Sequence, residues 1–147
     1  MKLKKNIKLL IASDGGAASG KTTASKLVSR KYNLNLLSSG LLYRYVSWKL
    51  LSRINLSNDH LYIKKIIKKI TLKKLKNNKL FKQNVTNNAY KIAKSKKIRI
   101  LLKKFQKDFA KKKLVCIEGR DIGNVICPKA DIKLFFKCDL KVRAKRR

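Results

Sequence analysis

Short apolar runs alternate along the chain with longer segments in which apolar residues recur every three or four positions. The runs are typical of strands buried on both faces, and the periodic segments are typical of amphipathic helices. The pattern predicts strands at residues 7–12, 34–37, 114–117 and 132–136. It predicts helices at about residues 24–32, 42–50, 57–70, 84–93 and 98–109, and a further helix capped by Asp139.

Strands that alternate with helices predict a parallel sheet with right-handed crossovers, so the expected fold class is α/β. Ligands bind to such sheets at the carboxyl ends of the strands. Polar segments follow the first three predicted strands, at residues 14–23, 38–44 and 118–123. All six glycines lie in these segments, which indicates one site where the backbone approaches a ligand closely.

Residues 71–81, between two predicted helices, show no clear period. Asn77 and Asn78 favour a turn, so we expect two short extended pieces on either side of it. No internal repeat or low-complexity linker divides the chain, and residues 1–147 are therefore expected to form a single domain.

The polar segment after the first strand has the spacing of a phosphate-binding loop. Gly15 and Gly20 bracket four residues and are followed by Lys21 and Thr22, and this G-x-x-x-x-G-K-[ST] pattern stands between a strand and a helix. In a P-loop, backbone N–H groups and a helix N-terminus converge on phosphate oxygens, the lysine reaches the β and γ phosphates, and the hydroxyl faces Mg²⁺. An ordinary strand–helix loop is the alternative, but the register of Lys21 and Thr22 favours the P-loop.

Composition indicates a soluble globular protein. Of the 147 residues, 44% are hydrophobic and one is proline, which suits one domain with a sizeable core. No apolar run approaches the roughly 20 residues that cross a bilayer, so no membrane partner is expected. The basic and apolar start of the chain imitates a signal peptide, but its apolar core is short and is followed by Asp14 of the P-loop match.

The cysteines and the single histidine indicate a reducing compartment and exclude one class of metal site. Cys116, Cys127 and Cys138 are unclustered and odd in number, which predicts small buried thiols in the cytoplasm. His60, the only histidine, is expected as a surface residue at the start of a helix. No metal site of His and Cys ligands can be formed from this inventory.

The formal net charge of +33 raises the alternative of a basic nucleic-acid-binding protein. Of the 40 basic residues, 32 are lysine and only eight are arginine. The lysines fall mostly between the apolar positions of the predicted helices, where a solvated face puts them. The chain also lacks a recognisable RNA or DNA module, so we expect no specific nucleic-acid partner.

Three motifs together resemble bacterial cytidylate kinase. They are the P-loop that begins with Asp14 and Gly15, the segment from Ser38 to Arg44, and the segment from Glu118 to Gly123 with Pro128 after it. Their order and separations also match, from the first motif to the end of the chain. The third motif, Gly-Arg-Asp-Ile-Gly, is the most specific, because other P-loop nucleoside monophosphate kinases do not carry it there.

The resemblance implies a P-loop NTPase fold like that of adenylate kinase, with a helical monophosphate-binding insertion at about residues 55–95. It implies transfer of the γ-phosphate of ATP to CMP or dCMP, with Mg²⁺. We further expect a monomer located in the cytoplasm. In this family such a reaction needs no side-chain nucleophile, because the acceptor phosphate is itself an anionic nucleophile that must be aligned with ATP.

The resemblance also implies roles for individual residues. Ser39 would contact the ribose of the acceptor, Arg44 and Arg120 its phosphate, and Arg99 and Asp121 the cytosine. Lys21, Arg44 and Arg120 would be the catalytic cations, and Glu118 would orient a water bound to Mg²⁺. The ATP phosphates would lie against Gly15, Gly16, Ala17, Ala18, Ser19, Gly20, Lys21, Thr22 and Thr23, with Thr22 as the metal-binding hydroxyl. As alternatives, Arg44 and Arg99 could be surface residues, and Glu118 and Asp121 could pair with Arg120.

Several residues depart from the pattern of the family. Gly16 stands in place of a usual proline, and Ser38 and Glu118 stand in place of aspartates. Tyr90 and Asn124 replace a serine and a threonine, which weakens the inference of base selectivity.

Relatives continue through a lid to a last strand and helix, and of that region this chain has only Arg143, Arg146 and Arg147. We therefore expect a fragment or truncated product with the lid and last strand missing. Loss of lid arginines can lower phosphoryl-transfer rates by ~10³ or more, so the chain is expected to bind nucleotide and turn over poorly. A nucleotide-binding remnant without catalysis is the corresponding alternative. A missing last strand should also expose a sheet edge and favour aggregation.

Overall fold

The computed structural model describes residues 7–52 and 60–146 and divides into two compact units. The first, here called the sheet unit, consists of the chain up to Ser38 and from Gln106 onward. The second, the helical unit, runs from Ser39 to Phe105. The sequence had suggested one domain with an insertion at about residues 55–95, and the helical unit begins earlier and ends later than that range.

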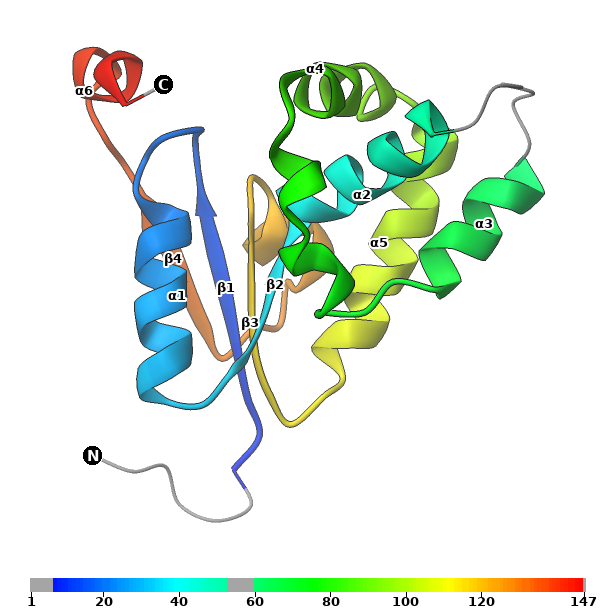
Figure 1. Cartoon of the computed structure of the whole chain (residues 1–147). Helices are drawn as coiled ribbons and strands as arrows, with labels where there is room; N and C mark the ends of the chain where they lie inside the picture. The colour runs from blue at the N-terminus through cyan, green and yellow to red at the C-terminus, as the bar shows by residue number, and fades with distance from the viewer. Residues whose placement is uncertain (1–6, 53–59, 147) are drawn as a thin grey trace. The chain divides into compact units, whose positions relative to one another are not determined.

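The sheet unit is built on a parallel sheet of four strands in the order β2-β3-β1-β4 (Figure 1). All three strand pairs are parallel, as the alternation of strands and helices predicted. Helix α1, Lys21–Lys31, follows β1 directly and packs against β1, β2 and β3. The strands are β1 at Leu9–Gly15, β2 at Asn35–Ser38, β3 at Leu114–Gly119 and β4 at Ile132–Phe136.

The strand register brings the polar ends of three strands to one edge of the sheet. In the β1–β3 ladder, Ser13 lies opposite Glu118 and Asp14 lies opposite Gly119. In the β2–β3 ladder, Ser38 also lies opposite Glu118. The predicted polar segments therefore start side by side, as expected for the ligand-binding edge of a parallel sheet.

The core of the sheet unit lies between the central strands and α1. Ile11 and Cys116 are buried and form a cluster with Leu34, against which Val28 of α1 packs. Burial raises the pKa of the Cys116 and Cys127 thiols above their usual values, so both remain protonated at neutral pH. The prediction of buried thiols is confirmed for these two, whereas Cys138 is only half-buried.

Strand β4 differs from the predicted strand buried on both faces. In the four-stranded sheet of the described residues it is an edge strand that pairs with β1. Phe135 is 67% exposed and Ile132 is 42% exposed. The prediction was wrong because an apolar run marks a strand without showing how many neighbours will cover it.

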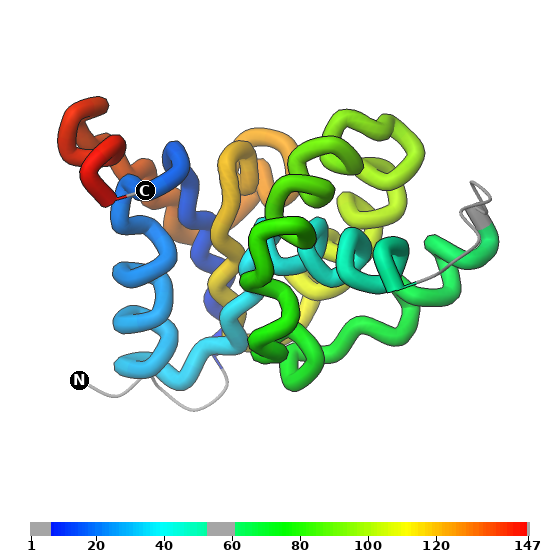
Figure 2. The backbone as a smooth tube through the Cα atoms, turned by 45° about the horizontal axis from the view of Figure 1, so that its top comes forward, coloured from blue at the N-terminus to red at the C-terminus, as the bar shows by residue number. Residues whose placement is uncertain are grey.

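The helical unit packs α2 against α4, and Figure 2 traces its backbone. The hydroxyl of Ser47 on α2 donates to the Val85 carbonyl oxygen of α4 at 2.8 Å and accepts from the Asn88 side-chain amide at 3.1 Å. The predicted helices are confirmed within a few residues, except that residues 57–59 of the third lie outside the described residues. The bounds are α2 at Ser39–Leu51, α3 at His60–Lys68, α4 at Gln83–Ile92 and α5 at Lys96–Ala110.

Residues 71–81 form two short 3₁₀ helices instead of the predicted extended pieces. They are η1 at Lys74–Lys76 and η2 at Asn78–Phe81, and each buries one leucine, Leu75 and Leu80. Asn77 lies between them as expected of a turn residue, but its side-chain oxygen accepts from Lys79 N at 2.9 Å and so caps η2. Capping by Asn and burial of the leucines favour helical turns over extended chain.

Two short elements follow β3 and β4. The first is a π-helical turn, η3, at Ile122–Ile126. The second is α6 at Leu140–Lys145, where the Asp139 side chain accepts from Lys141 N at 2.8 Å, so the predicted cap is confirmed. Within residues 7–52 and 60–146, no helix is both long and apolar enough to cross a bilayer.

Candidate active site

The P-loop pattern lies where β1 turns into α1, as the motif requires. Gly20 caps α1 in the left-handed conformation, with a φ of 89°, and Ala18 is also left-handed, with a φ of 58°. Left-handed residues in a loop before a helix turn successive N–H groups toward one concavity, which favours anions. The local backbone therefore has the features of a phosphate cradle.

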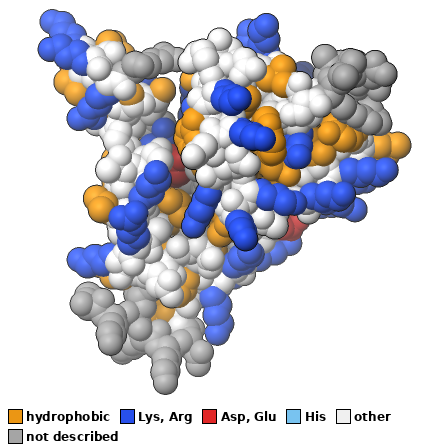
Figure 3. Space-filling view, viewed as in Figure 1, with side chains coloured by type: hydrophobic (Ala, Val, Ile, Leu, Met, Phe, Trp, Pro, Cys, Tyr) orange, Lys and Arg blue, Asp and Glu red, His pale blue; other side chains and the backbone are white. Residues whose placement is uncertain are grey.

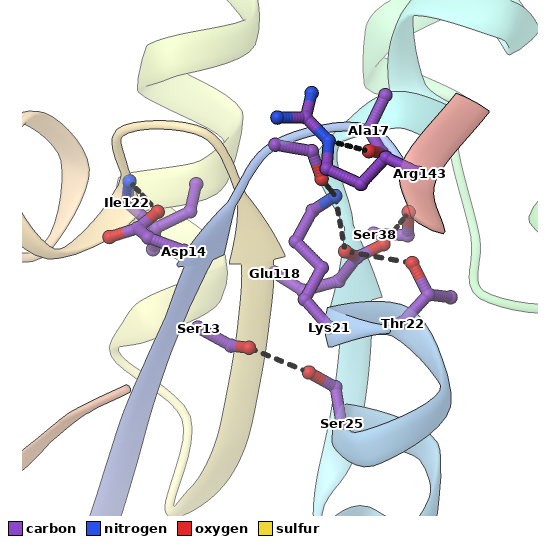
Figure 4. A network of polar contacts seen from close by, with 11 residues as sticks. Ser13, Asp14, Ala17, Lys21, Thr22, Ser25, Ser38, Glu118, Ile122 and Arg143 are labelled. Atoms are coloured by element: carbon purple, nitrogen blue, oxygen red, sulfur yellow. Dashed lines mark hydrogen bonds and ion pairs between the residues drawn. The ribbon is translucent and has the colours of Figure 1, made fainter. Parts of the chain in front are cut away.

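Lys21 lies over this loop rather than extending into solvent. Its Nζ donates to the Gly16 carbonyl oxygen at 3.1 Å and lies 3.9 Å from Oε2 of Glu118, and its side chain is only 14% exposed (Figure 4). The hydroxyl of Ser19, in the same loop, is buried without a hydrogen-bond partner among the described residues. A buried unsatisfied donor at a phosphate loop fits a ligand that brings its own oxygens.

Glu118, at the end of β3, connects the P-loop to the end of β2. Its Oε2 accepts from the Thr22 hydroxyl at 3.1 Å, and its Oε1 accepts from the Ser38 hydroxyl (Figure 4). The Glu118 side chain is only 5% exposed, and its carboxylate contacts Lys21, Thr22 and Ser38. The alternative, in which Glu118 simply pairs with Arg120, does not describe these contacts.

A second carboxylate, Asp14, binds the loop that follows β3. Its Oδ1 accepts from Ile122 N at 2.6 Å and its Oδ2 accepts from Gly123 N at 2.7 Å. Arg120 and Asp121 lie between β3 and these two contacts, with Arg120 exposed and Asp121 half-buried. Sequence reasoning treated Asp14 only as the first residue of a motif, and no local signal indicated a partner more than a hundred residues away.

Two arginines near the end of the described chain also contact the P-loop. Arg143 Nε donates to the Ala17 carbonyl oxygen at 2.9 Å, and Arg146 Nη1 approaches the Ala18 carbonyl oxygen at 3.4 Å. A Cβ on Gly16 would lie 2.8 Å from Cζ of Arg143, so the glycine at this position makes room for the guanidinium. The resemblance to the family placed these arginines in the lid region, whose arginines act on the transferring phosphoryl group, and did not indicate their contact with the P-loop.

The remaining predicted residues belong to the helical unit. Ser39 is buried in the first turn of α2, and the Arg44 guanidinium lies over the Phe81 ring at 5.4 Å from its centroid. Arg99 is exposed on α5. The structure thus brings together Lys21, Thr22 and Glu118 in the sheet unit, and Arg120 and Asp121 on a neighbouring loop of that unit. The proposed acceptor roles of Ser39, Arg44 and Arg99 remain predictions.

Comparison with known proteins identifies the family. A family model described as cytidylate kinase matches residues 11–147, which include the P-loop, Glu118 and the loop bound by Asp14. The chain belongs to the cytidylate kinase family. The resemblance inferred from the three motifs is thereby confirmed, together with the P-loop kinase fold.

Curated cytidylate kinases match nearly the whole of this chain. The enzyme of Acidiphilium cryptum is 37% identical over 139 residues, which cover 95% of this chain and 66% of the relative. That of Mycoplasma capricolum is 37% identical, with 95% and 68% covered, and that of Bartonella quintana is 39% identical, with 94% and 65% covered. The chain thus spans about two thirds of the length of the cytidylate kinases that it matches.

Proposed function

We propose that this chain transfers the γ-phosphate of ATP to CMP or dCMP, giving ADP and CDP or dCDP. The observation that carries the proposal is the contact of Lys21 and Thr22 of the P-loop with the buried Glu118 carboxylate, in a chain of the cytidylate kinase family. ATP as the phosphate donor follows from the family, and the choice of acceptor rests on the relatives' names and on the resemblance of the motifs.

On the donor side, residues 15–23 would hold the ATP phosphates. Among the described residues, Lys21 Nζ contacts the Gly16 carbonyl oxygen and, at a longer distance, the Glu118 carboxylate, so a phosphate oxygen can replace the carbonyl as its partner. The Thr22 hydroxyl and the Glu118 carboxylate are the oxygen donors that Mg²⁺ prefers. They would hold the ion together with phosphate oxygens and water, and the ion would neutralise charge on the phosphates.

On the acceptor side, Arg44 and Arg120 would bind the phosphate of CMP, and Ser39 would bind its ribose. Arg99 and Asp121 would contact the cytosine. A carboxylate can accept a hydrogen bond from the exocyclic amine of cytosine, and uracil lacks that donor. This difference supports CMP or dCMP as acceptor in preference to UMP.

The reaction itself needs alignment more than proton transfer. An oxygen of the CMP phosphate forms a bond to the γ-phosphorus of ATP, and the bond from that phosphorus to the β,γ-bridging oxygen breaks, so that ADP leaves. Both phosphates are negative, and the cations Lys21, Arg44 and Arg120 would offset their repulsion. Arg143 and Arg146, which reach the P-loop carbonyls, could add to this charge.

A coupled assay of ADP release tests the proposal. With Mg-ATP present, CMP or dCMP should support ADP release, whereas UMP and AMP should not. Lys21→Ala should lower the rate by ~10²-fold or more, because it removes a charge that acts on the transferring phosphoryl group. Lys26→Ala, on the exposed face of α1, is the matched control and should leave the rate unchanged.

Release with all four acceptors, or with none, would contradict the proposed reaction. Binding of ATP without ADP release would instead support the alternative, a nucleotide-binding protein without catalysis. We also infer a cytoplasmic location, which the three free cysteines support, and expect a monomer.

A further inference from the structure

Asp14 is a buried carboxylate that the proposed reaction does not use. It is 9% exposed, and both of its oxygens accept backbone N–H groups, from Ile122 at 2.6 Å and Gly123 at 2.7 Å. Hydrogen bonds to a charged acceptor are short and stronger than those between neutral groups. The two bonds join residues 108 and 109 positions apart in the chain, so they fix one strand end against a distant loop.

The loop is shaped to receive this carboxylate. A Cβ on Gly123 would lie 3.1 Å from Asp14 Oδ2 and 3.3 Å from Lys133 Cδ, so a side chain here would force the Asp14 carboxylate or the loop to shift. The turn η3 begins at Ile122, and the residue before it, Asp121, makes no side-chain cap to it. The first two N–H groups of η3 instead donate to the Asp14 carboxylate, which lies on β1.

This arrangement anchors Arg120 and Asp121 from both sides. On one side, Gly119 is held in the ladder with β1, where its partner is Asp14 itself. On the other side, Ile122 and Gly123 are held by the Asp14 side chain. Only two residues lie between the anchors, so their backbone has little freedom while both anchors are intact.

We propose that Asp14 is a positioning residue for the acceptor nucleotide, and this inference rests on the proposed function of Arg120 and Asp121. Asp14 precedes the P-loop directly, yet its carboxylate acts on the loop that would bind the acceptor. Asp14 therefore fixes the positions of Arg120 and Asp121, which would bind the acceptor, relative to β1, the strand that leads into the P-loop. Loss of its charge should loosen the acceptor side and leave ATP binding largely intact.

Asp14→Asn tests this inference with little change in side-chain size. An amide has one accepting oxygen, so its NH₂ group would face one of the two backbone donors and that hydrogen bond would be lost. Gly123→Ala disturbs the same contact from the opposite side. Ser13→Ala is the matched control, because the neighbouring Ser13 side chain points to α1 and accepts a hydrogen bond from the Ser25 hydroxyl instead (Figure 4).

Two measurements on the full 147-residue chain separate positioning from general stability. Hydrogen exchange followed by mass spectrometry should rise in peptides covering residues 119–127 in both site variants and not in the Ser13→Ala control. Calorimetry should show CMP affinity reduced by roughly tenfold in Asp14→Asn, the size expected for a lost charge-assisted hydrogen bond, with ATP affinity within about threefold of wild type.

Equal losses of CMP and ATP affinity would show that Asp14 only stabilises the sheet unit, and unchanged exchange at residues 119–127 would show that it does not order the loop. Either result overturns the inference. If the unsubstituted chain binds ATP but not CMP, the proposed function fails. The exchange measurement then still decides whether Asp14 holds Arg120 and Asp121 in place.

Discussion

At the scale of single residues, Ser38 acts on the site through Glu118. Its hydroxyl donates to one oxygen of the carboxylate, which leaves the other oxygen for Thr22 and Lys21. The resemblance to cytidylate kinases suggested an aspartate at this position, so a hydroxyl donor here replaces a second negative charge. A serine can orient Glu118, whereas two adjacent carboxylates would repel each other.

We therefore predict that Ser38→Ala weakens the Mg²⁺-dependent part of ATP binding by several-fold, up to about tenfold, because Glu118 loses the hydrogen bond that orients it. Titration of Mg²⁺ against ATP binding by calorimetry measures this. Ser38→Thr keeps the hydroxyl and should restore the wild-type dependence. An identical Mg²⁺ dependence in the alanine variant would show that Ser38 does not orient Glu118.

Residue chemistry also explains where sequence reasoning succeeded. The spacing of Gly20, Lys21 and Thr22 is local, and it predicted the conformation of the loop because few backbones satisfy a strand, a left-handed glycine and a helix start in succession. Asp14 and Ser38 were different. Their partners lie in β3 and the loop after it, and only the sheet register brings them together.

At the scale of elements, a buried hydroxyl pair joins α1 to β1. The side chains of Ser13 and Ser25 are hydrogen-bonded at 2.8 Å and both are buried. This contact holds the first turns of α1, which start at the P-loop, against the central strand. Ser29, one turn later, is also buried, but its hydroxyl has no hydrogen-bond partner among the residues that the structure describes.

Ser25→Ala should therefore lower the free energy of unfolding by ~1–2 kcal/mol, because it leaves the Ser13 hydroxyl buried without its partner. Ser29→Ala removes a hydroxyl that makes no hydrogen bond to a described residue, so it should change the free energy of unfolding by less than ~0.5 kcal/mol. Urea unfolding followed by circular dichroism measures both. Equal effects of the two substitutions would mean that the Ser13–Ser25 bond does not stabilise the packing of α1.

The helices could be predicted from sequence because their period reflects which face is buried, and the central strands because a continuous apolar run is typical of a strand buried on both faces. Strand β4 and the segment from residue 71 to residue 81 could not. The first has an apolar run whose burial depends on its position in the sheet, and the second depends on Asn77 as a cap and on burial of Leu75 and Leu80. In both cases the deciding contacts lie outside the segment itself.

At the scale of the whole molecule, the few carboxylates do little to balance the charge of +33. Asp14, Asp131 and Asp139 accept backbone N–H groups, and Glu118 lies in the P-loop network. Figure 3 shows Lys and Arg side chains spread over the visible face, not gathered in one patch. Such a distribution attracts polyanions without selecting a sequence.

We predict weak binding to a random oligonucleotide that falls steeply as salt rises, because it depends on counterion release. Lys21→Ala should leave this binding almost unchanged, since it removes one charge of many, while it should strongly reduce ATP binding. Fluorescence anisotropy of a labelled oligonucleotide at about 50 and 200 mM KCl measures the affinity at each salt concentration. Affinity that persists at the higher salt would instead support the alternative of a dedicated nucleic-acid-binding protein.

The sequence by itself determined the order of strands and helices, the P-loop and the family, because each of these follows from local periods, turn residues and spacing. Only the tertiary structure showed which groups each buried carboxylate contacts. Glu118 reaches Thr22 and Ser38, and Asp14 reaches Ile122 and Gly123, because parallel strands distant in sequence end at the same edge of one sheet. No local pattern encodes those contacts, since they depend on strand order and register.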